Sequence, residues 1–188
     1  MTARLAQALG VEATILPATD DRLRTWIDTP AGSFPFQAWF VARGHRDEVD
    51  AVRFEGEARP APGVLEALAE ADAIVIAPSN PYVSIWPILA VEQIRDALLA
   101  RRVPCVAVSP LVGGRAVKGP ADRMLARMAG GTTPEHVAGC YTGLIDALVV
   151  DESDSAGPLA VRRIVTKTLM TDLDSSRRLA EAVLRAAA

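Results

Sequence analysis

Residues 73–119 read AIVIAPSNPYVSIWPILAVEQIRDALLARRVPCVAVSPLVGGRAVKG. Two runs of apolar residues, 73–77 and 103–108, predict two β-strands, and the amphipathic segment between them predicts a helix. Strands without polar alternation are typical of a parallel sheet that helices cover on both faces. The stretch therefore predicts a parallel βαβ unit. Ligands of such sheets bind beyond the carboxyl ends of the strands, where both polar loops of this stretch lie.

The two polar loops combine small hydroxyl side chains, an amide and glycines, which let a ligand approach the backbone closely. We expect each loop to lead into a helix N-terminus, whose free N–H groups favour an anion such as a phosphate. An equally open interpretation is structural: a turn with a helix cap in the first loop and a tight bend in the second. The candidate phosphate-binding residues are Ser79, Asn80, Pro81, Ser84, Ser109, Gly113 and Gly114.

The rest of the chain continues an α/β pattern. Further strands are predicted at residues 11–16, 145–150 and 161–165, and the helix after the first loop is predicted to run over 85–98, with Ser84 as its cap. Residues 22–54 break this rhythm and predict a small antiparallel excursion, whose aromatic cluster we assign to the core. We predict an α/β fold of three layers, with a mostly parallel Rossmann-like sheet, in a single domain over residues 1–188. The aromatic cluster consists of Phe34, Phe36, Trp39 and Phe40.

Composition narrows the classes of function. The 188 residues are 50% hydrophobic and 23% charged, with a formal net charge of −3, which gives no support to nucleic-acid or anionic-membrane binding. No apolar run is long enough to span a bilayer, and the start of the sequence does not resemble an export signal. Cys105 lies in a predicted strand and Cys140 is far from it in sequence. The simplest expectation is a reduced, cytoplasmic protein.

Acidic residues offer candidates for metal binding. Asp20 and Asp21 follow the predicted strand 11–16, where they can hold Mg²⁺ beside a phosphate, although an Asx turn explains them as well. The acidic run 151–154 resembles a ligand set in number but is typical of a solvated surface. His45 and His136 lack partners at zinc-ligand spacing. The identity of any metal ligand therefore stays open.

Several motifs together resemble one family. They are Leu16-Pro17-x-Thr19-Asp20-Asp21, Phe36-Gln37-x-x-Phe40-Val41, Ala77-Pro78-Ser79-Asn80-Pro81, Ser84-Ile85-x-Pro87-Ile88-Leu89, Val106-Ala107-Val108-Ser109-Pro110, Gly113-Gly114-x-Ala116-x-x-Gly119-Pro120 and Thr168-Leu169-Met170. In this order they closely resemble the 2-phospho-L-lactate transferase family of coenzyme F-420 biosynthesis. The resemblance covers nearly the whole chain, and the ordered series is specific although each motif alone is weak.

The resemblance implies a transferase that requires Mg²⁺. Such enzymes move a phospholactyl group, or a phosphoenolpyruvyl group in actinobacteria, from a guanosine diphosphate-linked donor to a ribityl hydroxyl of the deazaflavin Fo, and GMP leaves. Carried over to this chain, Ser79, Asn80, Ser109, Gly113 and Gly114 serve the diphosphate and guanosine side of the donor. Asp20 and Asp21 are the candidates for the catalytic, metal-facing role.

The sequence also departs from the family pattern. Family members are longer and begin with a strand and a Gly-Gly-Thr-Gly loop, which this chain does not contain, so the residues of the acceptor site cannot be carried over. We expect exposed apolar surface and hence a homo-oligomer. Two alternatives stay open: a nucleotide- or sugar-nucleotide-binding regulator of the gluconeogenesis-factor type, and an inactive nucleotide-binding fragment.

Overall fold

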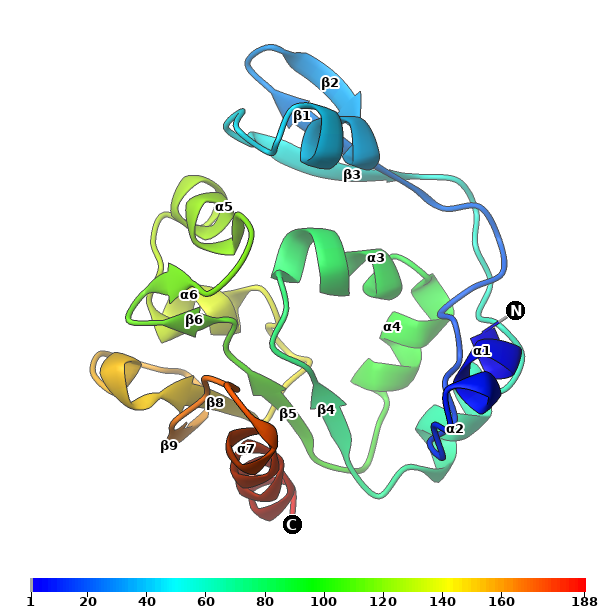
Figure 1. Ribbon diagram of the computed structural model, residues 1–188, viewed down its shortest axis with the longest axis vertical. Coiled ribbons are helices and arrows are strands. Elements are labelled where there is room, and N and C mark those ends of the chain that lie inside the picture. The colour runs from blue at the N-terminus through cyan, green and yellow to red at the C-terminus, as the bar shows by residue number, and fades with distance from the viewer. Residues whose placement is uncertain (1) are drawn as a thin grey trace.

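A four-stranded parallel sheet forms the centre of the protein. The computed structural model describes residues 2–188, with side chains from residue 4 onward (Figure 1). The sheet has the order β4-β5-β8-β9, and all three pairings are parallel. Every residue of β5 and β8 is buried, as continuous apolar strands predict. The strands are β4 (Ile74–Ile76), β5 (Cys105–Val108), β8 (Ala147–Asp151) and β9 (Arg162–Thr166).

Helices cover both faces of this sheet, which confirms the predicted three-layer α/β architecture. On one face, α7 (Leu173–Ala186) packs Leu179 and Val183 against alternate residues of β5 and β8. The opposite face lies in the larger core cluster with α4 (Glu92–Leu99) and α6 (Pro134–Gly139). The side chains facing α7 are Val106, Val108, Ala147 and Val149, and those facing the larger cluster are Cys105, Ala107, Leu148 and Val150.

The helix predicted over residues 85–98 is divided into three pieces. The π-helix η2 (Pro81–Ile85) runs directly into α3 (Trp86–Leu89), and an extended residue, Val91 (ψ 100°), separates α3 from α4. The cap of the first piece is Asn80, whereas Ser84 lies inside η2. The assignment of Ser84 as the cap is therefore wrong, because the helical segment begins four residues earlier than the apolar periodicity indicates.

The second polar loop contains a hairpin that the sequence analysis did not predict. Strands β6 (Leu111–Val112) and β7 (Arg115–Ala116) pair antiparallel, and α5 (Ala121–Met128) begins only after them. Gly113 and Gly114 form the turn with φ of 60° and 71°. Two successive left-handed residues are typical of a two-residue hairpin turn, so these glycines do not lead into a helix N-terminus.

The predicted antiparallel excursion is confirmed as a second, three-stranded sheet. Its strands β1 (Arg24–Thr29), β2 (Gly32–Pro35) and β3 (Ala51–Glu55) have the order β2-β1-β3, and the π-helix η1 (Ala38–Ala42) lies between β2 and β3. We call residues 24–55 the antiparallel lobe. Figure 1 shows this lobe beside the layered body, joined to it by two extended segments.

The strand predicted at residues 11–16 is absent. Helix α1 (Thr2–Ala8) is followed by Gly10 at φ 67°, and an irregular segment then leads to the lobe. The apolar residues Val11, Ile15 and Leu16 are exposed. A strand needs a neighbour that accepts its backbone hydrogen bonds, and this segment pairs with none of the described strands.

Two short helices complete the fold. Helix α2 (Val64–Glu70) packs near α4, and the 3₁₀ helix η3 (Glu152–Asp154) follows β8 directly. Within residues 2–188, no helix combines the length and the apolar character that crossing a bilayer requires.

Candidate functional site

A cleft of about 470 Å³ lies beyond the carboxyl ends of β4, β5 and β9. This volume is in the range of small-molecule sites in proteins. The cleft is amphipathic: hydroxyl groups and one lysine occupy part of its lining, and apolar side chains occupy the rest. The lining residues are Phe36, Phe40, Pro78, Ser79, Asn80, Val83, Ser84, Ser109, Pro110, Val112, Val117, Lys118, Gly119, Pro120, Ala121, Thr168, Leu169 and Met170.

Three serines and a lysine give the cleft its hydrogen-bond donors. The hydroxyls of Ser79 and Ser84 have no hydrogen-bond partner among residues 2–188. Ser109 is 3% exposed, and its Oγ accepts a hydrogen bond from Leu111 N at 3.2 Å, so its own hydrogen is free to be donated. Lys118 is exposed and forms no ion pair in the described part of the chain. Since the lining contains no carboxylate, the cleft favours an anionic ligand.

Asn80 lines the cleft, but its polar atoms are engaged inside the protein. Its Oδ1 accepts hydrogen bonds from the backbone N–H groups of Tyr82 at 2.9 Å and Val83 at 3.4 Å, and its Nδ2 lies 3.3 Å from Met124 Sδ. This is the bonding of an N-cap, which satisfies the first free N–H groups of a helix. The adjacent Pro81 is buried and outside the lining. The helix terminus expected to receive phosphate is thus already satisfied.

Gly113 and Gly114 lie outside the cleft lining. Their backbone N–H groups both donate to the carboxylate of Asp154, at 2.8 Å each. Successive N–H groups around left-handed residues form a concave nest that binds anions. The chemistry predicted for these glycines is therefore present, but the anion in the nest is a side chain of the same protein.

Asp151 supports one wall of the cleft, a role the sequence analysis did not foresee. This residue is 8% exposed at the end of β8, and its carboxylate accepts hydrogen bonds from the backbone and hydroxyl of both Ser153 and Thr168. Burial works to raise the pKa of Asp151, but these hydrogen bonds hold the pKa below that of an ordinary aspartate. Asp151 thereby fixes Thr168, which lines the cleft. The sequence signal that could have identified this role is the position of Asp151 directly after the predicted buried strand 145–150.

Asp20 and Asp21 lie in the segment that leads to the lobe and do not line the cleft. Asp21 Oδ2 accepts a hydrogen bond from Arg59 N at 2.8 Å, and Asp21 N donates to Thr19 Oγ1. The Thr19 hydroxyl therefore accepts the local bond of this turn, whereas the Asp21 carboxylate binds the backbone of a residue 38 positions further along the chain. The predicted placement beside a phosphate depended on the strand at 11–16, which is absent.

The described residues do not by themselves provide a site for Mg²⁺. Residues 2–188 contain no group of three or more His, Cys, Asp or Glu side chains arranged to hold a metal ion, and the cleft lining contains no carboxylate. Because Mg²⁺ is bound in proteins through carboxylates together with the phosphates of a ligand, the donor set of this cleft does not fit a resident ion.

The aromatic cluster has two roles. Trp39 is fully buried, as predicted for a core residue. Phe36 and Phe40 also pack against the core, but they line the cleft, with ring centroids 5.2 Å apart in a stacked arrangement. A stacked aromatic pair offers a flat apolar surface to a planar ligand. We call Phe36 and Phe40 the aromatic wall.

Comparison with known proteins agrees with the resemblance that the motifs carry. The model of the family "2-phospho-L-lactate transferase CofD" matches residues 1–187. A 2-phospho-L-lactate transferase of Methanosarcina mazei is 36% identical over 98% of this chain and 63% of its own length. A phosphoenolpyruvate transferase of Streptomyces coelicolor is 40% identical over 90% of this chain and 57% of its own length. The chain thus spans about three fifths of the length of these relatives.

A solved structure supports the fold. A UPF0052 family protein of Bacillus halodurans aligns with a TM-score of 0.64 and 19% sequence identity, over 97% of this chain and 65% of that one. At this identity the likeness concerns the fold alone. The match of the family model over residues 1–187 and the identity to the curated relatives show that this chain belongs to the 2-phospho-L-lactate transferase CofD family.

Proposed function

We propose that this chain contributes the donor site of a transferase in coenzyme F-420 biosynthesis. In the complete reaction, a phospholactyl or phosphoenolpyruvyl group moves from a guanosine diphosphate-linked donor to the ribityl hydroxyl of the deazaflavin Fo, and GMP is released. The names of the relatives support a transferase. One structural observation carries the assignment to the cleft: three serine hydroxyls and a lysine meet there without a carboxylate.

The polar side of the cleft suits a diphosphate. Ser79 and Ser109 follow neighbouring parallel strands, and Ser84 adds a third hydroxyl from η2. Hydroxyls and an ammonium group donate hydrogen bonds to phosphate oxygens, and such bonds are stronger when the acceptor is charged. We infer that these donors orient the diphosphate and stabilise the charge that develops on the departing nucleotide, the main contribution of a protein in phosphoryl-type transfers.

The family requires Mg²⁺ by resemblance, and the described residues do not supply a site for it. We therefore assign no step to the ion. Mg²⁺ would have to arrive with the phosphates of the donor, and the contribution of this chain is limited to the hydroxyls, Lys118 and the apolar surfaces of the cleft.

A calorimetric titration tests the proposal. Guanosine diphosphate with Mg²⁺ is titrated into the full chain, and the titration is repeated with UDP, ADP and a UDP-sugar. We expect binding that is selective for guanine. Selective binding of the UDP-sugar would instead favour the regulator alternative, and failure of every nucleotide to bind would remove the donor site from this chain.

Two lysines make a matched test of the cleft. Lys118→Ala removes the only cation of the lining, and Lys167→Ala removes an equal charge from an exposed residue outside it. We expect the dissociation constant for guanosine diphosphate to rise about tenfold in Lys118→Ala, the scale of one charge-assisted hydrogen bond. In Lys167→Ala it stays near the wild-type value. Equal losses in the two variants would show that only the overall charge matters.

A further inference from the structure

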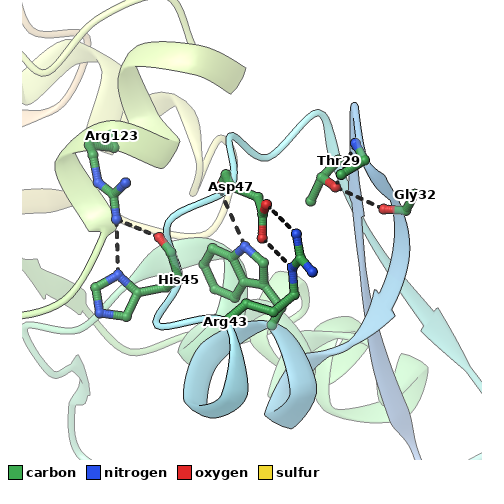
Figure 2. Close-up of polar contacts among 8 residues, drawn as sticks. Thr29, Gly32, Arg43, His45, Asp47 and Arg123 are labelled. Carbon is green, nitrogen blue, oxygen red and sulfur yellow. Dashed lines mark hydrogen bonds and ion pairs between the residues drawn. The ribbon is translucent and has the colours of Figure 1, made fainter.

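Helix α5 contacts the antiparallel lobe through two arginines, Arg123 and Arg127, which bind different kinds of partner. Arg127 Nη2 pairs with Asp50 at 2.7 Å. Arg123 forms no ion pair with a carboxylate in residues 2–188. Instead its Nη2 donates to the carbonyl oxygen of His45 at 2.7 Å and lies 2.9 Å from His45 Nδ1 (Figure 2). Arg123 is thus directed at the backbone and the ring of a single residue, His45.

Arg123 contacts both the backbone and the ring of His45. A guanidinium group can only donate hydrogen bonds, so the His45 carbonyl oxygen is the acceptor of the shorter contact.

The turn at His45 has an unfavourable backbone conformation. His45 has φ 44° and is the only residue other than glycine with positive φ in the described part of the chain. Left-handed backbone is disfavoured for a residue with a Cβ atom. Several hydrogen bonds hold the turn. Within the lobe, His45 N donates to Trp39 O at 2.9 Å, Trp39 Nε1 donates to Asp47 O at 3.3 Å, and Arg43 pairs with Asp47 at 2.6 Å. The His45 carbonyl also accepts from Arg123. Arg123 is the only one of these partners that lies outside the lobe.

The His45 ring is in contact with the aromatic wall of the cleft. Its centroid lies 5.0 Å from that of Phe40 and 6.1 Å from that of Trp39. Phe40 in turn stacks on Phe36. A continuous series of packed rings therefore connects the Arg123 contact to the cleft.

The lobe meets α5 both through packed apolar side chains and across a hollow. Trp39 and Val49 of the lobe are buried in one core cluster with Met124 of α5. A hollow of about 460 Å³ lies between the lobe and α5, and Trp39, Val49, Arg123 and Met124 are among its lining residues. Where two surfaces leave a space, dispersion contacts are lost and a few polar contacts have more influence on their relative position. Arg123 is one of the residues that line this hollow, and its guanidinium group contacts His45.

We propose that Arg123 is a positioning residue of the cleft: it holds the His45 turn and thereby sets the position of the Phe36–Phe40 wall. The proposal adds a residue that does not line the cleft. It rests on the proposed function only in taking the cleft as the ligand site, and on the expectation that a planar ring of the ligand contacts the wall.

Fluorine NMR tests the positioning without any ligand. The chain contains four phenylalanines, which can be labelled as 4-fluorophenylalanine and assigned by replacing them singly with leucine. In Arg123→Ala we expect the signals of Phe36 and Phe40 to shift or broaden, while that of Phe54 stays unchanged. Arg127→Ala is the matched control, because it removes the same side chain and a lobe contact of its own, to Asp50, that does not involve His45. If Arg123 acts through His45, the wall signals stay in place in this control.

Two further variants separate positioning from general stability. Arg123→Lys retains a donor and should restore part of the wild-type spectrum. His45→Gly keeps the carbonyl and relieves the left-handed backbone but removes the ring, so it should disturb Phe40 by itself. If Arg123 acts through His45, the double variant Arg123→Ala/His45→Gly should have nearly the same wall signals as His45→Gly alone, because the effects of two residues that act through one another do not add.

Binding provides the second measurement. Guanosine diphosphate and inorganic diphosphate are titrated into the wild type and both arginine variants. We expect the affinity for guanosine diphosphate to fall about tenfold in Arg123→Ala, the scale for a residue coupled to a site without touching it. The affinity for inorganic diphosphate, which has no ring, stays unchanged.

The two measurements have distinguishable failures. If wild-type protein binds no guanosine diphosphate, the proposed function fails, and the fluorine spectra still decide the role of Arg123. The inference on Arg123 is overturned if its removal leaves the Phe36 and Phe40 signals unchanged, if all four signals change together, or if Arg127→Ala has the same effect.

Discussion

The loops after β4 and β5 look equivalent in sequence, yet they satisfy their backbone in different ways. In the first loop, the amide oxygen of Asn80 accepts from the N–H groups of Tyr82 and Val83 within the same segment. In the second, the N–H groups of Gly113 and Gly114 donate to Asp154, which lies 41 and 40 residues further along the chain. The first solution is local, whereas the second depends on the tertiary structure.

The bonding within the two loops determines which hydrogen-bond donors of the cleft are free to bind a ligand. Both loops offer backbone N–H groups of the kind that bind phosphate, and in both loops the protein itself supplies the acceptor. The hydroxyls of Ser79, Ser84 and Ser109 keep a hydrogen to donate. The chemical character of the cleft therefore comes from side chains that follow the strands, and the backbone of the loops has a supporting role.

Among the variants that test the two loops, Asn80→Ala has the largest expected effect on the stability of the protein. We expect the free energy of unfolding to fall by about 2 kcal/mol, because two helix N–H groups in a partly buried segment lose their acceptor. Urea denaturation measures the change. Asn80→Asp keeps an acceptor oxygen and should be milder. If both variants lose the same stability, capping is not the role of this side chain.

The two glycines of the hairpin should respond unequally. A Cβ at Gly114 would lie 3.2 Å from Thr132 Oγ1, whereas one at Gly113 would lie 3.7 Å from Ser153 Oγ. Both residues have positive φ, so we expect losses of about 1.5 kcal/mol for Gly114→Ala and about 1 kcal/mol for Gly113→Ala. Thermal denaturation measures both.

Gly119→Ala serves as the reference for these variants. Gly119 has φ 71°, and no atom lies within 4 Å of a Cβ built there. This variant therefore reports the backbone contribution alone. A loss in Gly119→Ala as large as that in Gly114→Ala would contradict the assigned effect of Thr132.

Asp154→Ala has the smallest expected effect on stability, about 0.5 to 1 kcal/mol, because its hydrogen bonds are partly exposed. The sharper measurement is amide hydrogen exchange, which should become faster at Gly113 and Gly114 and stay unchanged at Tyr82. Glu152→Ala is the control, since Glu152 is a neighbouring exposed acid. Unchanged exchange rates at both glycines in Asp154→Ala would show that another group accepts the hydrogen bonds of their N–H groups.

Local patterns predicted much of the body correctly. Continuous apolar residues at 103–108 and 145–150 indicated buried parallel strands, and these segments contain β5 and all of β8 except its last residue, Asp151. The break in rhythm at 22–54 indicated the antiparallel lobe. The apolar segment 11–16 was interpreted in the same way and is not a strand, because its apolar side chains meet no neighbouring strand. An apolar segment is buried only where another part of the chain packs against it, and a local sequence pattern does not show whether that happens.

The sequence by itself therefore determined the class of fold, the family, and the placement of Ser79 and Ser109 after two apolar strands, because apolar runs and side-chain chemistry are local properties of the sequence. Only the tertiary structure decided which polar groups are free. Asn80 and Asp154 accept the hydrogen bonds of the N–H groups in the two loops. Asp151 holds Thr168 in place, and the lobe brings the Phe36–Phe40 wall to the cleft. Each of these outcomes depends on partners that meet by folding, and hydrogen-bond satisfaction can be assessed only when both partners are in place.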